Sequence, residues 1–337
     1  MKIFVTGGLG FMGSDFIRYV MGLPGNHHVL NYDKMTYAAN PENVADVATY
    51  RRYRLVKGDI ADRKTVDRVV KSFKPDLIVN YAAETHVDRS ILDPRPFMET
   101  DIVGTQVLLD AVMRYKIPRF VQISTDEVYG SIAKGKFTET SPLQPNSPYA
   151  ASKAGGDLMV RAYHRTFGAP VFVTHSCNNF GPYHYPEKVI PLFITNLLEG
   201  KQVPLYGDGR NVREWIYVRD HSRAVWLVAG KGTIGEVYNI GTGYELTNRV
   251  LTEKILKLLE LPQSRVKKVK DRPGHDLRYA LDTKKITVLG YQPSYSFDEG
   301  LRETVQWFQD HQAWWRRIKS GEYRRYYQQN YAKRIES

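Results

Sequence analysis

The first half of the chain alternates short apolar segments with helical patterns, and this alternation constrains the fold more than any other feature. Six segments have the apolar, β-branched character of buried strands. They are Ile3–Thr6, Val29–Asp33, Tyr53–Gly58, Leu77–Ala82, Phe120–Ser124 and Val171–His175. Between them, helices are predicted near 14–21, 62–73, 97–115 and 149–167. Such alternation is typical of a parallel sheet covered on both faces. We therefore expect an α/β fold with a Rossmann-type doubly wound parallel sheet.

The character of the sequence changes after about residue 180, where a turn-rich stretch, 181–186, begins. Short strands at Trp215–Val218 and Val237–Ile240 then mix with helices near 220–229, 250–260 and 298–310. We expect 1–180 to form the dinucleotide-binding domain, rejoined by part of 214–245. Residues 181–337 should form mainly a smaller α/β C-terminal domain that closes over a substrate.

Length and composition narrow the class of protein. The chain has 337 residues, of which 42% are hydrophobic and 25% charged, as in a soluble globular protein with one large or two ordinary domains. No apolar run approaches the roughly 18 residues that span a bilayer. The start of the chain leads directly into a glycine loop, so no signal peptide is expected. A single cysteine, Cys177, favours the cytoplasm.

The net charge of +12 favours an anionic partner: nucleic acid, acidic lipid or a nucleotide diphosphate. Basic residues are spread along the chain, which argues against nucleic acid. The densest cluster, within 316–334, interleaves basic residues with tyrosines. We interpret it as a solvated amphipathic terminal helix and extension, rather than a nucleic-acid patch with stacking aromatics. We thus expect neither a nucleic-acid nor a membrane partner.

Gly7, Gly10 and Gly13 lie between the first strand and the first helix. Glycines in that context permit a tight turn and let the backbone approach a pyrophosphate at a helix N-terminus. Asp33 ends the second strand, where a carboxylate accepts hydrogen bonds from a ribose 2′-OH and repels a 2′-phosphate. The pattern predicts an NAD site, the alternative being an ordinary turn with a capping aspartate. Asp59 and Ile60 would lie beside the adenine.

Tyr149 and Lys153 lie one helical turn apart and should point the same way. A phenol beside an ammonium can take a proton from an alcohol. Asp126 and Glu127 follow the fifth predicted strand, and two acids there could move two further protons. The set suits an oxidation followed by an elimination. By themselves, the two acids could equally be a turn and a helix cap. No Cys/His cluster has metal-ligand spacing, so no metal is expected.

Longer motifs link these residues to a known family. They comprise 82–90 (AAETHVDRS), 125–127 (TDE), Tyr149-x-x-x-Lys153, 178–182 (NNFGP), 186–188 (PEK) and 271–276 (DRPGHD). Over nearly its whole length the chain resembles the extended short-chain dehydrogenase/reductase family, and within it the nucleotide-sugar 4,6-dehydratases. Epimerases of that family usually carry smaller or neutral residues at the acid pair. Glu214 and Thr85 stand where the family usually has aspartate and serine.

The resemblance implies a reaction cycle on dTDP-glucose that yields a 4-keto-6-deoxy sugar nucleotide. Tyr149, with its pKa lowered by Lys153 and the cofactor, would remove the C4 hydroxyl proton as hydride passes to NAD. Thr125 would hold the C4 oxygen, Glu127 would remove the C5 proton, and Asp126 would protonate the departing C6 hydroxyl. Alternatives are a 4,6-dehydratase for another nucleotide sugar such as UDP-glucose, a nucleotide-sugar 4-epimerase, and a non-catalytic protein that binds NAD or RNA.

The resemblance also implies the binding residues. Those for NAD are Gly7, Gly10, Phe11, Met12, Gly13, Asp33, Lys34, Thr36, Asp59, Ile60, Ala82, Ala83, Thr100, Tyr149, Lys153 and Asn178. Those for the nucleotide sugar are Thr85, Thr125, Asn179, Glu187, Lys188, Pro204, Tyr206, Arg213, Asn248, Arg272 and His275. A homodimer is implied as well, through the helices near 97–115 and 149–167.

Overall fold

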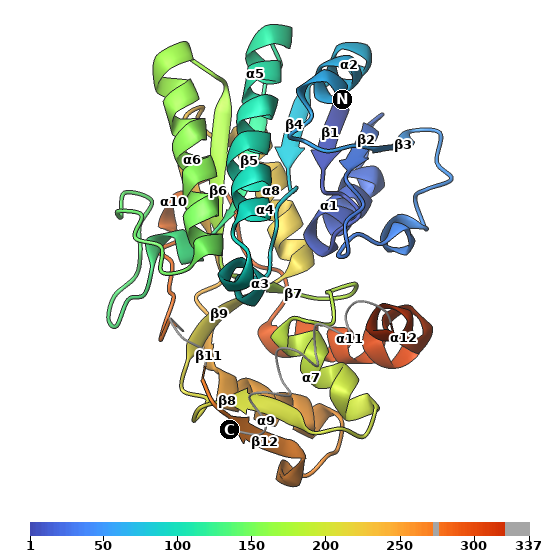
Figure 1. Cartoon of the computed structure of the whole chain (residues 1–337), viewed down its shortest axis with the longest axis vertical. Helices are drawn as coiled ribbons and strands as arrows, with labels where there is room; N and C mark the ends of the chain where they lie inside the picture. The colour runs from blue at the N-terminus through green and yellow to red at the C-terminus, as the bar shows by residue number, and fades with distance from the viewer. Residues whose placement is uncertain (272–275, 321–337) are drawn as a thin grey trace.

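The computed structural model describes residues 1–271 and 276–320. Figure 1 shows two parts: a large sheet flanked by helices, and below it a smaller part built from the later chain. Arg272, His275 and the basic, tyrosine-rich segment beyond residue 320 lie outside the described residues.

The large part is built on a seven-stranded sheet in which every pairing is parallel, in the order β10-β6-β5-β4-β1-β2-β3. The strands are β1 Lys2–Thr6, β2 His28–Asp33, β3 Tyr53–Lys57, β4 Leu77–Asn80, β5 Phe120–Thr125, β6 Val171–Ser176 and β10 Val237–Ile240. All six strands predicted in the first half exist, with ends shifted by at most two residues. The expected Rossmann-type fold is confirmed.

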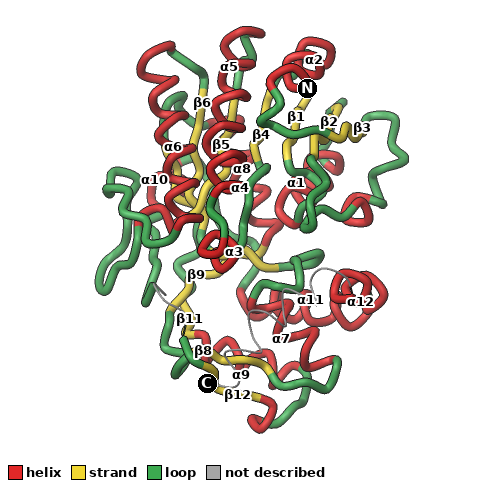
Figure 2. Tube along the Cα trace, viewed as in Figure 1, coloured by secondary structure: helices red, strands yellow, loops and turns green. Residues whose placement is uncertain are grey.

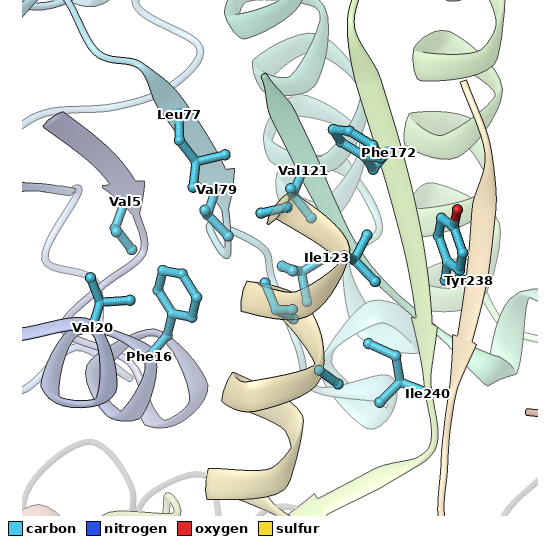
Figure 3. Close-up of a cluster of buried hydrophobic side chains, with 14 of the residues drawn as sticks. Val5, Phe16, Val20, Leu77, Val79, Val121, Ile123, Phe172, Tyr238 and Ile240 are labelled. Atoms are coloured by element: carbon cyan, nitrogen blue, oxygen red, sulfur yellow. The ribbon is translucent and has the colours of Figure 1, made fainter. Parts of the chain in front are cut away.

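Helices cover both faces of this sheet because its side chains alternate between them. Ile3 and Val5 point to one face and pack with Phe16 of α1 (Phe11–Gly22) and with α8 (Val218–Lys231), as Figure 3 shows in part. Phe4 points to the other face and belongs to an apolar cluster with residues of α2 (Arg63–Phe73), α5 (Thr105–Tyr115) and α6 (Pro148–Phe167). Burial on both faces explains why these strands are apolar throughout.

The single helix predicted over 97–115 is wrong in detail. The chain instead forms α3 (Val87–Leu92), α4 (Arg95–Met98), a π-helical segment η2 (Glu99–Gly104) and then α5. The π-helical segment η2 lies where α6 passes very close to its backbone. A Cβ on Gly156 of α6 would stand 2.6 Å from the carbonyl oxygen of Asp101. Ser152 of α6 donates to the Asp101 carboxyl group at 2.6 Å. Single π-helical turns often occur beside functional sites.

The smaller part combines short strands with helices, as Figure 2 shows. Its three-stranded sheet has the order β11-β9-β7, and a second sheet pairs β12 with β8. The strands are β7 Asn178–Phe180, β8 Val203–Tyr206, β9 Val212–Tyr217, β11 Glu245–Thr247 and β12 Val266–Val269. The helices are α7 Val189–Leu198, α9 Asn248–Leu258, α11 Phe297–Asp310 and α12 Gln312–Ser320. Short segments complete the chain: η1 Pro41–Val44, η3 Asp126–Tyr129, η4 Gln263–Arg265 and α10 Lys284–Val288.

The smaller part has its own apolar core, in which Phe180, Trp215, Phe308 and Trp315 are buried. The chain does not divide between the two parts at a single point, because β10 pairs with β6 at the edge of the large sheet. Within residues 1–271 and 276–320, no helix is both long and apolar enough to cross a bilayer.

Candidate active site

The carboxyl ends of the parallel strands open onto one cavity of about 320 Å³. All the residues predicted to bind NAD line it, although they come from seven stretches of the first 178 residues. Thr125, Asp126 and Glu127 line the same cavity, as do Thr85, Asn179 and Lys188. The structure therefore brings the predicted cofactor residues and the predicted acid pair to one place.

The glycine loop closes one end of the cavity. Gly7 has a φ of +65°, and a Cβ there would stand 2.7 Å from the backbone nitrogen of Ala82. A Cβ on Gly13 would stand 2.5 Å from the carbonyl oxygen of Gly7. The helix that follows, α1, begins with no side-chain cap and no acidic residue in its first turn. Its first N–H groups can therefore hold an anion.

Asp33 lies at the end of β2 and organises this loop. Its carboxylate accepts hydrogen bonds from the N–H of Leu9 at 2.9 Å and of Met35 at 2.8 Å. Burial raises the pKa of Asp33, although these two bonds oppose the shift. Beside it, Lys34 forms an ion pair with Asp59 at 2.7 Å. The end of the cavity where the ribose of a dinucleotide is expected thus holds two carboxylates. Asp33 is hydrogen-bonded to the loop, and Asp59 is paired with Lys34.

Tyr149 and Lys153 project from the first two turns of α6, which Ser147 caps through the N–H of Ala150. The N–H of Tyr149 donates to the Ser90 hydroxyl at 3.1 Å, which ties this end of α6 to α3. The buried ammonium of Lys153 donates to the carbonyl of Ile123 at 2.7 Å. The helix is thereby held against the end of β5, where Thr125 and the acid pair begin.

The protein surroundings of Tyr149 oppose ionisation of its phenol. Burial, followed by the charges of Glu127 and Asp101, raises the pKa of Tyr149 well above its usual value. The Lys153 ammonium donates to a backbone carbonyl. The Thr125 hydroxyl is hydrogen-bonded to Tyr149 and favours the phenolate. A positive charge on a ligand in the cavity would further stabilise a phenolate.

Asp126 and Glu127 form the first turn of η3, the 3₁₀ segment after β5, with Thr125 as its N-cap. Asp126 is buried, and its Oδ2 atom has no hydrogen-bond partner among the residues described. Burial, with the neighbouring charges of Glu127 and Glu214, raises the pKa of Asp126 well above its usual value. Burial of Asp126 thus favours the protonated form of its carboxyl group, which suits a proton donor.

A second cavity, of about 170 Å³, adjoins the first and shares Glu127, Asn178 and Lys188 with it. Five further residues predicted to bind the nucleotide sugar line it: Glu187, Pro204, Tyr206, Arg213 and Asn248. The structure thus places the described residues among those predicted to bind the nucleotide sugar in two adjoining cavities that share Glu127.

Polar groups in these cavities suit a nucleotide. The guanidinium of Arg213 lies over the Tyr279 ring at 4.3 Å and donates to the carbonyls of Val212 at 2.7 Å and Asp276 at 3.0 Å. The side-chain Oδ1 atoms of Asn178 and Asn179 are buried and have no hydrogen-bond partner in the described part of the chain. Orphaned buried acceptors beside a cavity call for a donor on a ligand.

A set of noncovalent contacts joins the two parts beside the first cavity. Tyr37, in the loop after β2, donates to Glu187 at 3.2 Å. Arg89 lies over the Tyr37 ring at 3.7 Å and within 3.6 Å of the Glu187 carboxylate. The neighbours of Tyr37 on both sides, Thr36 and Ala38, line the cavity. We call these three residues the Tyr37–Arg89–Glu187 clasp.

Sequence reasoning missed several residues that line the cavities. His184 is buried and stacks on Phe11 of the glycine loop, with ring centroids 4.3 Å apart. Trp215 lines both cavities, and Tyr279 lines the second. Only His184 carried a usable signal, since it lies in the turn-rich stretch just after the two asparagines. No group of acidic, His and Cys side chains within 1–271 and 276–320 could hold a metal ion.

Comparison with known proteins agrees with this geometry. A family model described as GDP-mannose 4,6 dehydratase matches residues 4–304. The chain therefore belongs to this family, within the extended short-chain dehydrogenases/reductases. A dTDP-glucose 4,6-dehydratase of Streptomyces niveus is 54% identical, with 95% of this chain and 96% of the relative covered.

Two solved structures show the range of the fold. The dTDP-glucose 4,6-dehydratase DesIV of Streptomyces venezuelae, crystallised with NAD bound, has a TM-score of 0.92 and 52% identity, covering 95% of this chain and 100% of its own. A UDP-glucose 4-epimerase of Thermus thermophilus, in complex with NAD, has a TM-score of 0.85 and 30% identity, covering 92% and 100%. The fold is thus shared by dehydratases and epimerases, so the fold alone does not choose between them.

Asp101 generates a prediction about stability and pH. Burial raises the pKa of its carboxyl group to about 7 in the folded chain, against about 3.9 when unfolded. A raised pKa contributes stability that is complete below the unfolded value and is lost as the pH rises through the folded value. Relative to Asp101→Asn, the unmodified protein should lose about 1 kcal/mol per pH unit from about pH 4 to about pH 7. Urea unfolding of both proteins at several pH values measures this, and a difference that does not change with pH would contradict it.

Proposed function

We propose that this chain is an NAD-dependent dTDP-glucose 4,6-dehydratase, which converts dTDP-glucose to dTDP-4-keto-6-deoxyglucose. The observation that carries the proposal is the shared cavity: Tyr149 and Lys153 line it together with Asp126 and Glu127. Relatives named dTDP-glucose 4,6-dehydratase at 54% and 49% identity support the choice of substrate.

The residues present fit NAD. The glycine loop leaves no room for a Cβ at Gly7 or Gly13, so only backbone faces a pyrophosphate there. The buried, unpartnered Oδ1 of Asn178 can accept from a carboxamide. Asp33 would accept from the adenosine ribose, and Lys153 would hold the nicotinamide ribose. NAD, when bound, takes the hydride from C4 of the sugar, returns it to C6, and supplies a positive ring near Tyr149.

The first half of the reaction is an oxidation at C4. Tyr149 takes the proton of the C4 hydroxyl as the C4–H bond breaks, and Thr125, hydrogen-bonded to Tyr149, holds the C4 oxygen. The chain by itself raises the pKa of Tyr149 through burial and two carboxylates. The phenol is therefore protonated until a cationic ligand is beside it, so base strength develops only in the loaded site.

The second half is a loss of water across C5 and C6. A ketone at C4 acidifies the C5 proton, which Glu127 removes. Asp126, kept protonated by burial and by Glu127 and Glu214, gives its proton to the departing C6 hydroxyl. After hydride return to C6, the proton held by Glu127 restores C5. The proton that Tyr149 took from the C4 hydroxyl replaces the one that Asp126 lost to the departing water, so both side chains return to their starting states. The sum is one substrate in, one water and one keto sugar out, with no net oxidation.

The competing function is 4-epimerisation, since an epimerase shares the fold with 30% identity. Epimerisation needs Tyr149 and the cofactor but no acid pair. A buried acid with a raised pKa beside a second carboxylate has no task in that reaction. This observation favours the dehydratase.

Incubation of the purified chain with dTDP-glucose tests the proposal. The expected product is lighter than the substrate by one water and carries a 4-ketone, which mass spectrometry of the sugar nucleotide detects. Recovery of dTDP-galactose alone would instead identify an epimerase. Parallel incubations with UDP-, CDP- and GDP-glucose settle the nucleotide, and turnover of UDP-glucose in preference to dTDP-glucose would overturn the substrate assignment.

Glu127→Gln separates the two halves of the reaction. Oxidation at C4 should continue, because Tyr149, Lys153 and Thr125 are unchanged, while water loss should slow by about 10²–10⁴-fold. Rapid quench and mass spectrometry should show dTDP-4-ketoglucose accumulating. Glu303→Gln is the matched control, since Glu303 accepts a hydrogen bond from Tyr217 away from both cavities. Normal formation of the 6-deoxy product by Glu127→Gln would show that another group removes the C5 proton.

We also propose a homodimer formed through the helices α3 to α6. Large apolar side chains are exposed along these elements and η2: Ile91, Leu92, Met98, Val103, Met113, Leu158 and Phe167. Leu92 is 70% exposed and Leu158 54% exposed, which suits a surface covered by a second copy.

The single cysteine, Cys177, is buried and unpaired, which supports a reducing compartment such as the cytoplasm.

Sedimentation tests the dimer. At micromolar concentration the chain should sediment at about twice 38.8 kDa. Leu158→Glu should shift it towards the monomer, because a carboxylate would have to be buried at the contact. Val288→Glu, at an apolar residue 86% exposed on α10, should remain dimeric. Sedimentation of the unmodified chain as a monomer would exclude this assembly.

A further inference from the structure

A buried line of hydrogen-bonded side chains runs behind the acid pair. Ser124 donates to Oδ2 of Asp157 at 2.6 Å, and Nε2 of His175 lies 3.1 Å from the same oxygen. Nδ1 of His175 lies 2.6 Å from the Tyr129 hydroxyl, which lies 2.9 Å from Oδ1 of Asn239. None of the five side chains is more than 5% exposed. The catalytic scheme above uses none of them.

The directions of these bonds follow from Asn239. Its Nδ2 donates to the carbonyls of Phe137 at 3.0 Å and Asp282 at 3.2 Å, so the Oδ1 atom faces Tyr129 and can only accept. Tyr129 therefore donates to Asn239. Burial raises the pKa of Tyr129, so its phenol keeps that proton. The phenol oxygen must then accept from His175, and Nδ1 of His175 carries a proton.

The other ring nitrogen faces a carboxyl group. Two acceptor atoms do not lie 3.1 Å apart without a proton between them, so either Nε2 of His175 or Oδ2 of Asp157 carries a proton that points at the other atom. Ser124 supplies a second donor to the same oxygen. The side chains from Asp157 to Asn239 are therefore joined by an unbroken run of hydrogen bonds, with a proton on Nδ1 of His175 directed at Tyr129.

His175 joins the two elements that carry the catalytic groups. Asp157 lies on α6, one turn beyond Lys153 and two turns beyond Tyr149. Tyr129 is the last residue of η3, whose first two residues are Asp126 and Glu127. His175 itself lies on β6, which is paired with β5. Side-chain hydrogen bonds thus lead from the helix of the base, through one imidazole, to the turn of the acid pair.

We propose that His175 is a positioning residue that sets the placement of Asp126 and Glu127 relative to Tyr149 and Lys153. This inference rests on the proposed function, because only a two-stage reaction on one sugar ring needs both sets of groups in register. Both sets must reach the same ring in succession, and a misplacement of about 1 Å can cost on the order of 10²-fold in rate. His175 thereby controls the rate of water loss relative to that of C4 oxidation.

Two substitutions each keep one half of the imidazole. In His175→Gln the amide can reach the position of Nε2 and keeps the contact with Asp157, while the contact with Tyr129 is lost. In His175→Asn the amide nitrogen can replace Nδ1 and keeps the contact with Tyr129. Tyr129→Phe removes the hydroxyl from the other side. Tyr163→Phe is the matched control, because Tyr163 lies on α6 and donates to Asp110 at 2.5 Å, outside this line.

Single-turnover experiments on dTDP-glucose, with quenching and mass spectrometry, give the rates of C4 oxidation and water loss separately. In His175→Gln and Tyr129→Phe, water loss should slow about 10–100-fold while C4 oxidation stays within about threefold. His175→Asn should change the ratio less, because Ser124 still ties Asp157 to β5. Tyr163→Phe should keep the ratio of the unmodified enzyme.

The ratio of the two rates does not depend on how much of a variant is folded. If both rates fall by the same factor, or the active fraction alone falls, His175 has a merely structural role and the proposal is overturned. NMR of protein labelled at the histidine ring nitrogens gives a readout without turnover. A proton bonded to Nδ1 of His175 supports the proposal, and an unprotonated Nδ1 overturns it. An unmodified enzyme that is inactive on dTDP-glucose would instead overturn the proposed function.

Discussion

The parallel pairing of β1, β4, β5 and β6 is the constraint on which the site depends. Parallel strands end at the same edge of a sheet, so segments that are distant in sequence are delivered to one crevice. Thr6, Thr125 and Ser176 end three of these strands, and the cavity begins just beyond them. The apolar strand interiors make this arrangement stable, because each strand is buried on both faces.

Burial in and beside the crevice changes the pKa of several side chains. Burial raises the pKa of Asp126, Asp101 and Tyr149 in the same direction, since each of these groups is charged only after losing its proton. Burial therefore favours the protonated forms of these groups. The oxidation at C4 releases one proton to Tyr149. The loss of water moves one proton from C5 to Glu127 and another from Asp126 to the departing hydroxyl, so a protonated Asp126 is needed at the second step.

Much of the fold and of the candidate site could be predicted from the sequence. The features that could not be predicted depend on contacts between distant segments or lack a distinct local pattern. The strands, the glycine loop and the Tyr149–Lys153 spacing are local signals, and the structure places them as expected. Helix α7 was missed because it is short, mostly apolar and buried along most of its length, so its sequence cannot be told from a buried strand by periodicity. The π-helical segment depends on a backbone approach by Gly156, which no local pattern records. Glu187 is 150 residues from Tyr37, so their contact could not be inferred from spacing.

The Tyr37–Arg89–Glu187 clasp has a consequence for how the protein deals with its dinucleotide. The loop that carries Tyr37 lines the first cavity and is fastened to the smaller part of the molecule. A dinucleotide bound in that cavity would contact this loop at Thr36 and Ala38, on either side of Tyr37. Because the sugar gives up and then recovers the same two electrons, no exchange is needed between catalytic cycles. The dinucleotide would then act as a resident prosthetic group, and the output of the enzyme would be insensitive to the redox balance of the surrounding nicotinamide pool.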